Sequence, residues 1–124
     1  MKTISSMDEL TKIVSECDDK RLIIKATARW CGPCKKIQPF YDRLSVILEA
    51  THPVVFSVFD IDDVPELSDH LAVRTLPTFV CISETDSCTL ASSDPEQLQA
   101  WIKQCLETKQ HFINNQEKKS RRKK

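Results

Sequence analysis

The chain has 124 residues, of which 40% are hydrophobic, and its 18 basic and 18 acidic side chains leave a formal net charge of zero. This length and apolar content suit one domain with a single core and argue against a second domain. We expect a soluble cytoplasmic protein without membrane contact, because no apolar run has the length of a signal peptide core or a membrane-spanning helix. The charge is uneven, with −5 on residues 1–116 and +5 on residues 117–124.

The first elements predicted are a short strand and a helix. Residues 2–5 can form a short edge strand, and Ser6 and Glu9 have the spacing of a capping box, which marks the start of a helix. Apolar residues at helical spacing follow, and the helix should end near Cys17.

A buried strand and a long helix should come next. Residues 22–28 are typical of a largely buried strand, and the helical spacing of the apolar residues after them predicts a helix over residues 34–50. Pro39 lies within that helix and should bend it. The β-branched and aromatic run at residues 54–60 predicts a strand covered on both faces, which we place at the centre of the sheet.

The second half of the chain predicts a short helix over residues 65–71, a strand over residues 78–83 and a short strand over residues 88–90. Asp94 as N-cap and Pro95 at the first helical position mark the start of a last helix. Strands that alternate with helices predict an α/β fold, in which helices cover both faces of a mixed sheet.

The run Trp-Cys-Gly-Pro-Cys-Lys at residues 30–35 places two thiols one helical turn apart, where a buried strand gives way to a helix. Cys31 should precede the helix N-terminus, where unpaired backbone N–H groups and the helix dipole favour a thiolate over a thiol. Gly32 is expected to allow a tight turn between the cysteines, and Pro33 suits the first helical turn. Cys34 should then lie inside that turn, facing Cys31.

This arrangement predicts reversible disulfide chemistry. Cys31 would attack a substrate disulfide, and Cys34 would resolve the mixed disulfide by displacing the reduced substrate and closing an internal bond. The alternative is an inert cysteine pair in a turn, against which the flanking Trp30 and Lys35 argue.

The sequence resembles the thioredoxin family over roughly residues 2–107. The motif at residues 30–34 matches the family's active-site signature, and Leu76-Pro77-Thr78 resembles its cis-proline loop. The resemblance implies a thioredoxin fold and a substrate groove, with the Leu76 backbone paired to an extended substrate strand. The residues of that groove would be Trp30, Leu76, Pro77 and either Ala91 or Ser92.

Lys25 departs from the family pattern. Thioredoxins usually carry a buried Asp six residues before the first cysteine and a Lys on the neighbouring strand, whereas this chain has Lys25 and Val58 at those positions. A charged Lys25 would stabilise a thiolate on Cys31 or Cys34 and make the protein a stronger oxidant. A neutral Lys25 would accept a proton from Cys34, and a Lys25 that extends to the edge of the sheet would do neither.

The other cysteines, Cys17, Cys81, Cys88 and Cys105, are expected to be free thiols in a reducing compartment. Cys81 and Cys88 are candidates for cross-strand neighbours, either joined as a disulfide or, as we favour, present as buried small hydrophobic residues. The three histidines are scattered and no second CxxC accompanies the first, so we expect no metal site and no cofactor beyond the redox-active disulfide.

The end of the chain is strongly basic. We expect a thioredoxin-like domain over residues 1–107 and a polar, disordered tail over residues 108–124. The run Lys118–Lys124 has the charge of a nuclear-localisation or nucleic-acid-binding patch, but it lacks interleaved aromatic residues and better suits a solubilising tail. The acidic residues over positions 60–66 are expected to form a solvated loop and helix start.

Two functions agree with these features. The first is a monomeric protein-disulfide reductase that acts on exposed disulfides of client proteins through Cys31 and Cys34. The resemblance implies a thioredoxin-reductase-like electron donor for it. The second is a binding module in which a thioredoxin fold holds a partner, and the altered surroundings of Lys25, Ala91 and Ser92 have made redox turnover incidental.

Overall fold

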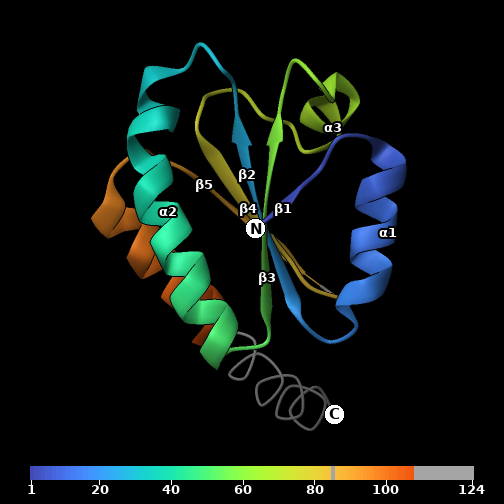
Figure 1. Cartoon of the computed structure of the whole chain (residues 1–124), viewed down its shortest axis with the longest axis vertical. Coiled ribbons are helices and arrows are strands. Elements are labelled where there is room, and N and C mark those ends of the chain that lie inside the picture. Colours follow the sequence, from blue (N-terminus) through green and yellow to red (C-terminus); the bar gives the residue numbers. More distant parts are fainter. Residues whose placement is uncertain (85, 108–124) are drawn as a thin grey trace, which may run out of the picture.

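A computed structural model of the chain describes residues 1–84 and 86–107. These residues form a five-stranded mixed sheet with the strand order β1-β3-β2-β4-β5 and helices on both faces, which confirms the predicted fold class (Figure 1). The expectations of a disordered tail over residues 108–124 and of a basic patch at Lys118–Lys124 lie outside the described residues.

The elements follow the predicted order, with bounds that differ from the predicted ones by no more than two residues. They are β1 (Lys2–Thr3), α1 (Met7–Cys17), β2 (Arg21–Thr27), α2 (Gly32–Thr51), β3 (Val54–Asp60), α3 (Pro65–His70), β4 (Thr78–Ile82) and β5 (Ser87–Ala91). Residues 95–107 are also helical, and this segment is called helix 95–107 below. None of the described helices has both the length and the apolar character needed to cross a membrane.

Ser6 is the N-cap of α1, as predicted, but the Glu9 side chain binds the residue before the N-cap instead of closing a capping box with Ser6. Ser6 Oγ accepts a hydrogen bond from the Glu9 N–H at 3.1 Å, and the Glu9 carboxylate accepts one from the Ser5 N–H at 2.7 Å. The first bond satisfies an N–H group that has no partner within the helix, so α1 begins where the sequence indicates.

The central strand of the sheet is β2. It pairs in parallel with β3, where Lys25 lies opposite Val58, and antiparallel with β4, where Lys25 lies opposite Phe79. The prediction that residues 54–60 form the central strand is therefore wrong. A strand next to the central one, such as β3, is also covered on both faces. Its apolar sequence therefore does not show whether it lies at the centre of the sheet or beside it.

Helices α1 and α3 cover one face of the sheet, while α2 and helix 95–107 cover the other (Figure 1). On the second face, the Tyr41 ring of α2 packs against Phe56 and Phe79, with centroids 5.4 Å and 5.3 Å away. The buried Tyr41 hydroxyl donates a hydrogen bond to the Ser57 carbonyl at 2.8 Å, so its polar atom is satisfied. These contacts hold α2 against β3 and β4 and so fix the helix that carries the motif cysteines.

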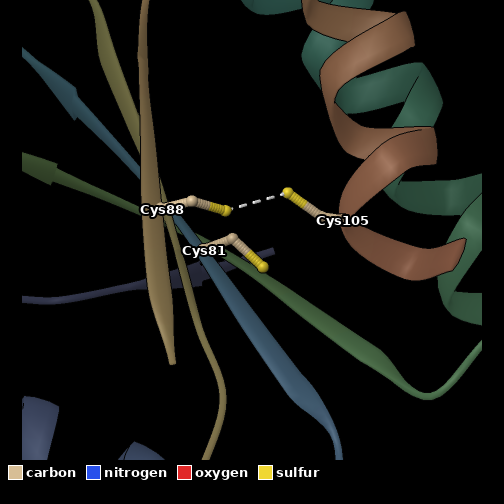
Figure 2. Close-up of side chains that lie close together, drawn as sticks. All are labelled: Cys81, Cys88 and Cys105. Carbon is tan, nitrogen blue, oxygen red and sulfur yellow. Dashed lines mark hydrogen bonds between the residues drawn. The ribbon is translucent and has the colours of Figure 1, made fainter. Parts of the chain in front are cut away.

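The four cysteines outside the motif are free thiols. Cys81 on β4 lies directly opposite Cys88 on β5, which confirms that they are cross-strand neighbours. Helix 95–107 adds Cys105, whose Sγ lies 3.4 Å from that of Cys88 (Figure 2). Because Cys88 is exposed on an edge strand, the expectation of two buried small hydrophobic residues is correct for Cys81 and wrong for Cys88.

Candidate active site

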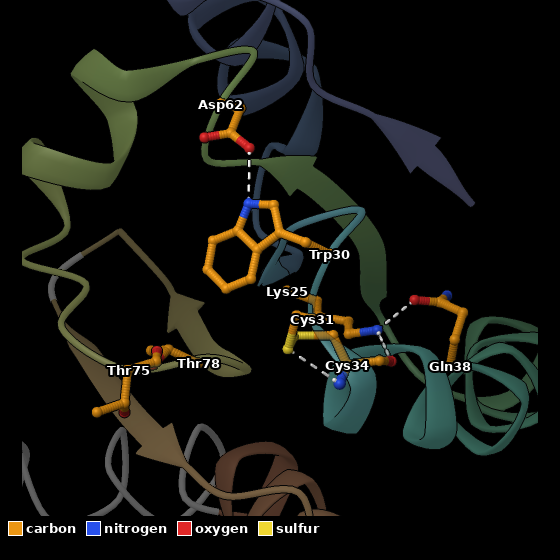
Figure 3. Close-up of a disulfide and its surroundings, with 8 residues drawn as sticks. All are labelled: Lys25, Trp30, Cys31, Cys34, Gln38, Asp62, Thr75 and Thr78. Atoms are coloured by element: carbon orange, nitrogen blue, oxygen red, sulfur yellow. Dashed lines mark hydrogen bonds between the residues drawn. A yellow bond between two sulfur atoms is a disulfide. The ribbon is translucent and has the colours of Figure 1, made fainter.

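Cys31 and Cys34 lie at the N-terminus of α2, and Cys31 is its N-cap. The two residues form a disulfide, with Cα atoms 5.3 Å apart, a usual separation for such a bond. The Cys34 N–H donates a hydrogen bond to Cys31 Sγ at 3.2 Å (Figure 3). This N–H group and the helix dipole favour negative charge on the Cys31 sulfur once the disulfide is reduced.

The two sulfur-bearing residues differ in exposure. Cys34 is fully enclosed, whereas 5% of Cys31 remains exposed, and both pack against Ala28. An incoming disulfide can therefore reach Cys31 from solvent, while Cys34 lies behind it.

Gly32 has no special backbone conformation. It is the first residue of α2 and does not have a positive φ, and a Cβ built at this position would meet no atom within 4 Å. The expectation that a glycine is needed for a tight turn is therefore wrong, because the turn between the cysteines is an ordinary helical turn. Pro33 occupies the first turn of α2, as predicted.

The segment before α2 is held by acidic residues of the loop after β3. The Trp30 indole is 67% exposed and donates a hydrogen bond through Nε1 to Asp62 at 2.9 Å (Figure 3). Arg29 forms ion pairs with Asp63 at 2.9 Å and with Asp60 at 3.6 Å. The expectation of a merely solvated acidic loop is therefore corrected, since these side chains position the residues that lead into the active-site helix.

A pocket opens beside Cys31. Its lining residues are Trp30, Cys31, Gly32, Pro33, Ile61, Ser68, Val73, Arg74, Thr75 and Leu76. The segment just before the cis Leu76–Pro77 peptide bond thus faces the motif, as the resemblance implies. The sequence did not single out Arg74 and Thr75, because nothing in the local pattern distinguishes them from other loop residues.

The other groove residues predicted from the sequence lie beyond this pocket. Ala91 is the last residue of β5 and lies opposite Thr78 at the start of β4. Neither Pro77, Ala91 nor Ser92 is among the described residues that line the pocket beside Cys31. Their part in a groove remains a prediction.

Lys25 is enclosed beneath the two cysteines. It is 1% exposed, and its Nζ donates hydrogen bonds to the Cys34 carbonyl at 2.8 Å and to the Gln38 side-chain oxygen (Figure 3). A Lys25 that extends to the edge of the sheet is therefore excluded. Burial lowers the pKa of Lys25 to about 8, an effect that the Asp42 carboxylate partly opposes.

Gln38 and Asp42 extend this contact to the surface of α2. The Gln38 amide accepts from Lys25 and donates through Nε2 to Asp42 at 2.8 Å. Sequence reasoning missed both residues. Their spacing of four places them on one face of a helix, but only the direction of the Lys25 side chain connects that face to the site.

The family model described as Thioredoxin matches residues 2–104. The chain belongs to the thioredoxin family. A thioredoxin from Oryctolagus cuniculus is 31% identical over 107 residues, which cover 86% of this chain and 99% of that protein. Thioredoxin domain-containing protein 8 from Mus musculus is 34% identical over 89 residues, 72% of this chain and 68% of that protein. Among solved structures, a Plasmodium falciparum thioredoxin matches with a TM-score of 0.76 and 30% identity, over 84% of this chain and 98% of the other.

Within this family the cysteine pair at the start of α2 is the active site. Cys31 and Cys34 are held at bonding distance at the active-site position of a thioredoxin fold. This thioredoxin-family protein is therefore a thiol–disulfide oxidoreductase, and its activity is dithiol/disulfide exchange.

Lys25 is predicted to destabilise the fold at neutral pH. Its pKa falls from 10.5 to about 8 on folding, which corresponds to a penalty of roughly 3 kcal/mol for the buried ammonium below pH 8. The unfolded chain keeps this proton up to about pH 10.5, so the penalty is relieved as the pH rises from 8 to 10.5. Lys25→Met should raise the free energy of unfolding by up to about 3 kcal/mol at pH 7.

Urea unfolding at pH 7 and at pH 10 measures this effect, and the gain from Lys25→Met should shrink at the higher pH. Lys36→Met, which changes an exposed lysine of α2, is the control and should shift stability by less than about 0.5 kcal/mol at either pH. A loss of stability in Lys25→Met at pH 7 would show that the hydrogen bonds of Lys25 outweigh its burial.

Proposed function

We propose that this protein reduces disulfides of client proteins, with Cys31 as nucleophile and Cys34 as resolving thiol. The observation that carries the proposal is the Cys34 N–H aimed at Cys31 Sγ at 3.2 Å, in a pair of which only Cys31 is accessible. The Cys31 thiolate attacks one client sulfur, and the other client sulfur leaves as a thiolate. Cys34 then attacks the Cys31 sulfur, releases the second client thiolate and restores the internal disulfide.

Trp30, Leu76 and Pro77 are proposed to position the client. Trp30 and Leu76 line the pocket beside Cys31, and an extended client segment can pair with the Leu76 backbone as strands pair at a sheet edge. A client segment that runs past Pro77 reaches the end of β5, where Ala91 or Ser92 would form the outer wall.

Each turnover leaves the pair oxidised, so the cycle needs a donor of two electrons. We assign this role to a thioredoxin-reductase-like partner. The protein itself is proposed to act as a monomer in the cytoplasm. A reducing compartment agrees with the four cysteines that remain free thiols, which are Cys17, Cys81, Cys88 and Cys105.

Insulin reduction tests the proposed cycle. The wild type should turn over insulin with NADPH and a thioredoxin reductase, and also with dithiothreitol as a chemical donor. Cys31→Ser should abolish turnover because the attacking sulfur is gone. Cys34→Ser should accumulate mixed disulfides on Cys31, visible as adducts that a reductant releases.

Cys17→Ser is the control, because it removes a buried thiol on α1 that takes no part in the cycle. The binding-module alternative predicts a different pattern. A partner retained equally well by the variant that lacks both Cys31 and Cys34, together with negligible turnover by the wild type, would refute the reductase.

Lys25 is proposed to stabilise the reduced pair through its charge. A pKa of about 8 leaves most Lys25 side chains protonated at pH 7. The ammonium lies 2.8 Å from the Cys34 carbonyl, on the enclosed side of the pair. A cation in this position favours a thiolate and so stabilises the dithiol relative to the disulfide.

Lys25→Asp should therefore lower the reduction potential of the Cys31–Cys34 pair, by about 30 mV or more, since 30 mV is a tenfold change in the equilibrium constant. Lys25→Met, which removes the positive charge without adding a negative one, should give an intermediate potential. The reduction potentials of the wild type and of both variants are measured by equilibrating each protein with glutathione buffers and quantifying the Cys31 and Cys34 thiols. Equal potentials would mean that Lys25 has neither of the two redox roles considered for it.

A further inference from the structure

A second group of thiols lies where β4, β5 and helix 95–107 meet (Figure 2). The Sγ atoms of Cys81, Cys88 and Cys105 lie within 4.8 Å of one another, and those of Cys88 and Cys105 are 3.4 Å apart. Cys88 is exposed, whereas Cys81 and Cys105 are buried. The group therefore has one sulfur that solvent can reach and two behind it.

Arg21 brings a positive charge to this thiol group. Its side chain is 3% exposed, its Nη1 lies 3.8 Å from Cys81 Sγ, and its buried Nε has no hydrogen-bond partner in the described part of the chain. Within residues 1–84 and 86–107, the ion pairs formed by arginine side chains involve Arg29 and not Arg21. A buried guanidinium without a carboxylate favours an anion beside it, and Cys81 is the group in contact that can ionise.

The thiols around Arg21 differ in acidity. The neighbouring Cys105 thiol is the main cause that lowers the pKa of Cys81 to about 7, while burial opposes this shift and Arg21 assists it. The Cys81 sulfur in turn raises the pKa of Cys105. Burial raises the pKa of Cys88, which the Cys105 thiol opposes and the charges of Cys81 and Asp86 assist. Of the three thiols, Cys81 is therefore the one that ionises most readily.

We propose that Cys88 and Cys105 are a second redox pair, which forms a disulfide by exchange with a low-molecular-weight disulfide, while Cys81 is a positioning residue that accepts the proton. Cys88 passes its proton to the Cys81 thiolate and attacks one sulfur of the external disulfide. The displaced sulfur leaves and takes the proton from Cys81. Cys105 then gives its proton by the same route and attacks the Cys88 sulfur, which releases the second external thiol.

Two protein thiols thus supply two electrons, one external disulfide becomes two thiols, and the Cys81 thiolate is restored. We assign the disulfide to Cys88 and Cys105 because their sulfur atoms are already in contact, 3.4 Å apart. Bond formation shortens this distance to about 2.05 Å. Cys88 lies on the edge strand β5, which has one neighbouring strand and can shift toward helix 95–107.

A soft metal ion is the competing occupant, since three thiolates can bind one. The guanidinium of Arg21 beside Cys81 opposes a bound cation but stabilises a reactive thiolate, so the charges favour disulfide exchange.

The test uses the full chain with Cys31→Ser and Cys34→Ser, so that the catalytic pair cannot contribute. The reduced protein is incubated with oxidised glutathione in the presence of a chelator, then alkylated and mapped by peptide mass spectrometry. The expected result is a loss of two thiols per chain, a peptide that links Cys88 to Cys105 and no retained glutathione. Wild-type protein with an intact Cys31–Cys34 disulfide is a second background, should the double variant fold poorly.

Three further variants separate the roles. Cys105→Ser should stop the reaction at a glutathione adduct on Cys88. Cys81→Ala and Arg21→Gln should slow the linkage about tenfold and move its pH profile to higher pH, because the proton acceptor or the charge that stabilises it is missing. Cys17→Ser, the matched control, should change neither the rate nor the pH profile.

A Cys81–Cys88 linkage, a lasting glutathione adduct on Cys88 with Cys105 present, or no loss of thiols would overturn the proposal. So would an unchanged pH profile in Cys81→Ala. In a chelator-free arm, uptake of one Zn²⁺ per chain that protects all three thiols from oxidised glutathione would show a metal site instead. These outcomes do not depend on insulin reduction by Cys31 and Cys34, so the two proposals can fail separately.

Discussion

The hydrogen bond from the Cys34 N–H to Cys31 Sγ is the interaction on which the active site depends. It exists because α2 begins at Gly32, directly after Cys31, so that a free N–H group of the first helical turn, that of Cys34, faces the sulfur. The contacts of Tyr41 with β3 and β4 fix the position of α2, and the acidic loop after β3 fixes the segment that leads into it. An ordinary helix start thereby becomes a site that favours a thiolate.

The central strand β2 carries two buried cations, Arg21 at its start and Lys25 in its middle. Both faces of this strand are covered, so neither side chain reaches the water that normally surrounds a charge. Each cation lies close to a cysteine instead, Lys25 against the Cys34 backbone and Arg21 against the Cys81 sulfur. Each cation thus lies beside a cysteine that can ionise, although the Asp42 carboxylate also acts on Lys25, and one strand relates the two thiol groups.

Local features were predictable from the sequence because local chemistry determines them. The capping residue Ser6 fixed the start of α1, and the motif around Cys31 fixed the start of α2 and the kind of chemistry. The role assigned to Gly32 was wrong because it was inferred from residue type, whereas the backbone there is an ordinary helical turn.

Features that depend on tertiary packing were not predictable in the same way. The central position of β2 follows from strand pairing, which the apolar pattern of a covered strand does not specify. Cys105 meets Cys88 only because helix 95–107 packs beside β5, and Trp30 meets Asp62 only because two loops come together. The direction of Lys25 likewise became clear only from its contacts with α2.

The most direct test of the account is the rate at which Cys31 of the reduced protein reacts with iodoacetamide at pH 7. The reference is Cys31 in the same protein unfolded in urea, where the helix and its N–H groups are absent. A site that stabilises the Cys31 thiolate predicts a reaction faster by about tenfold or more in the folded protein, although folding leaves this residue less exposed. An equal or slower reaction in the folded protein would contradict the account.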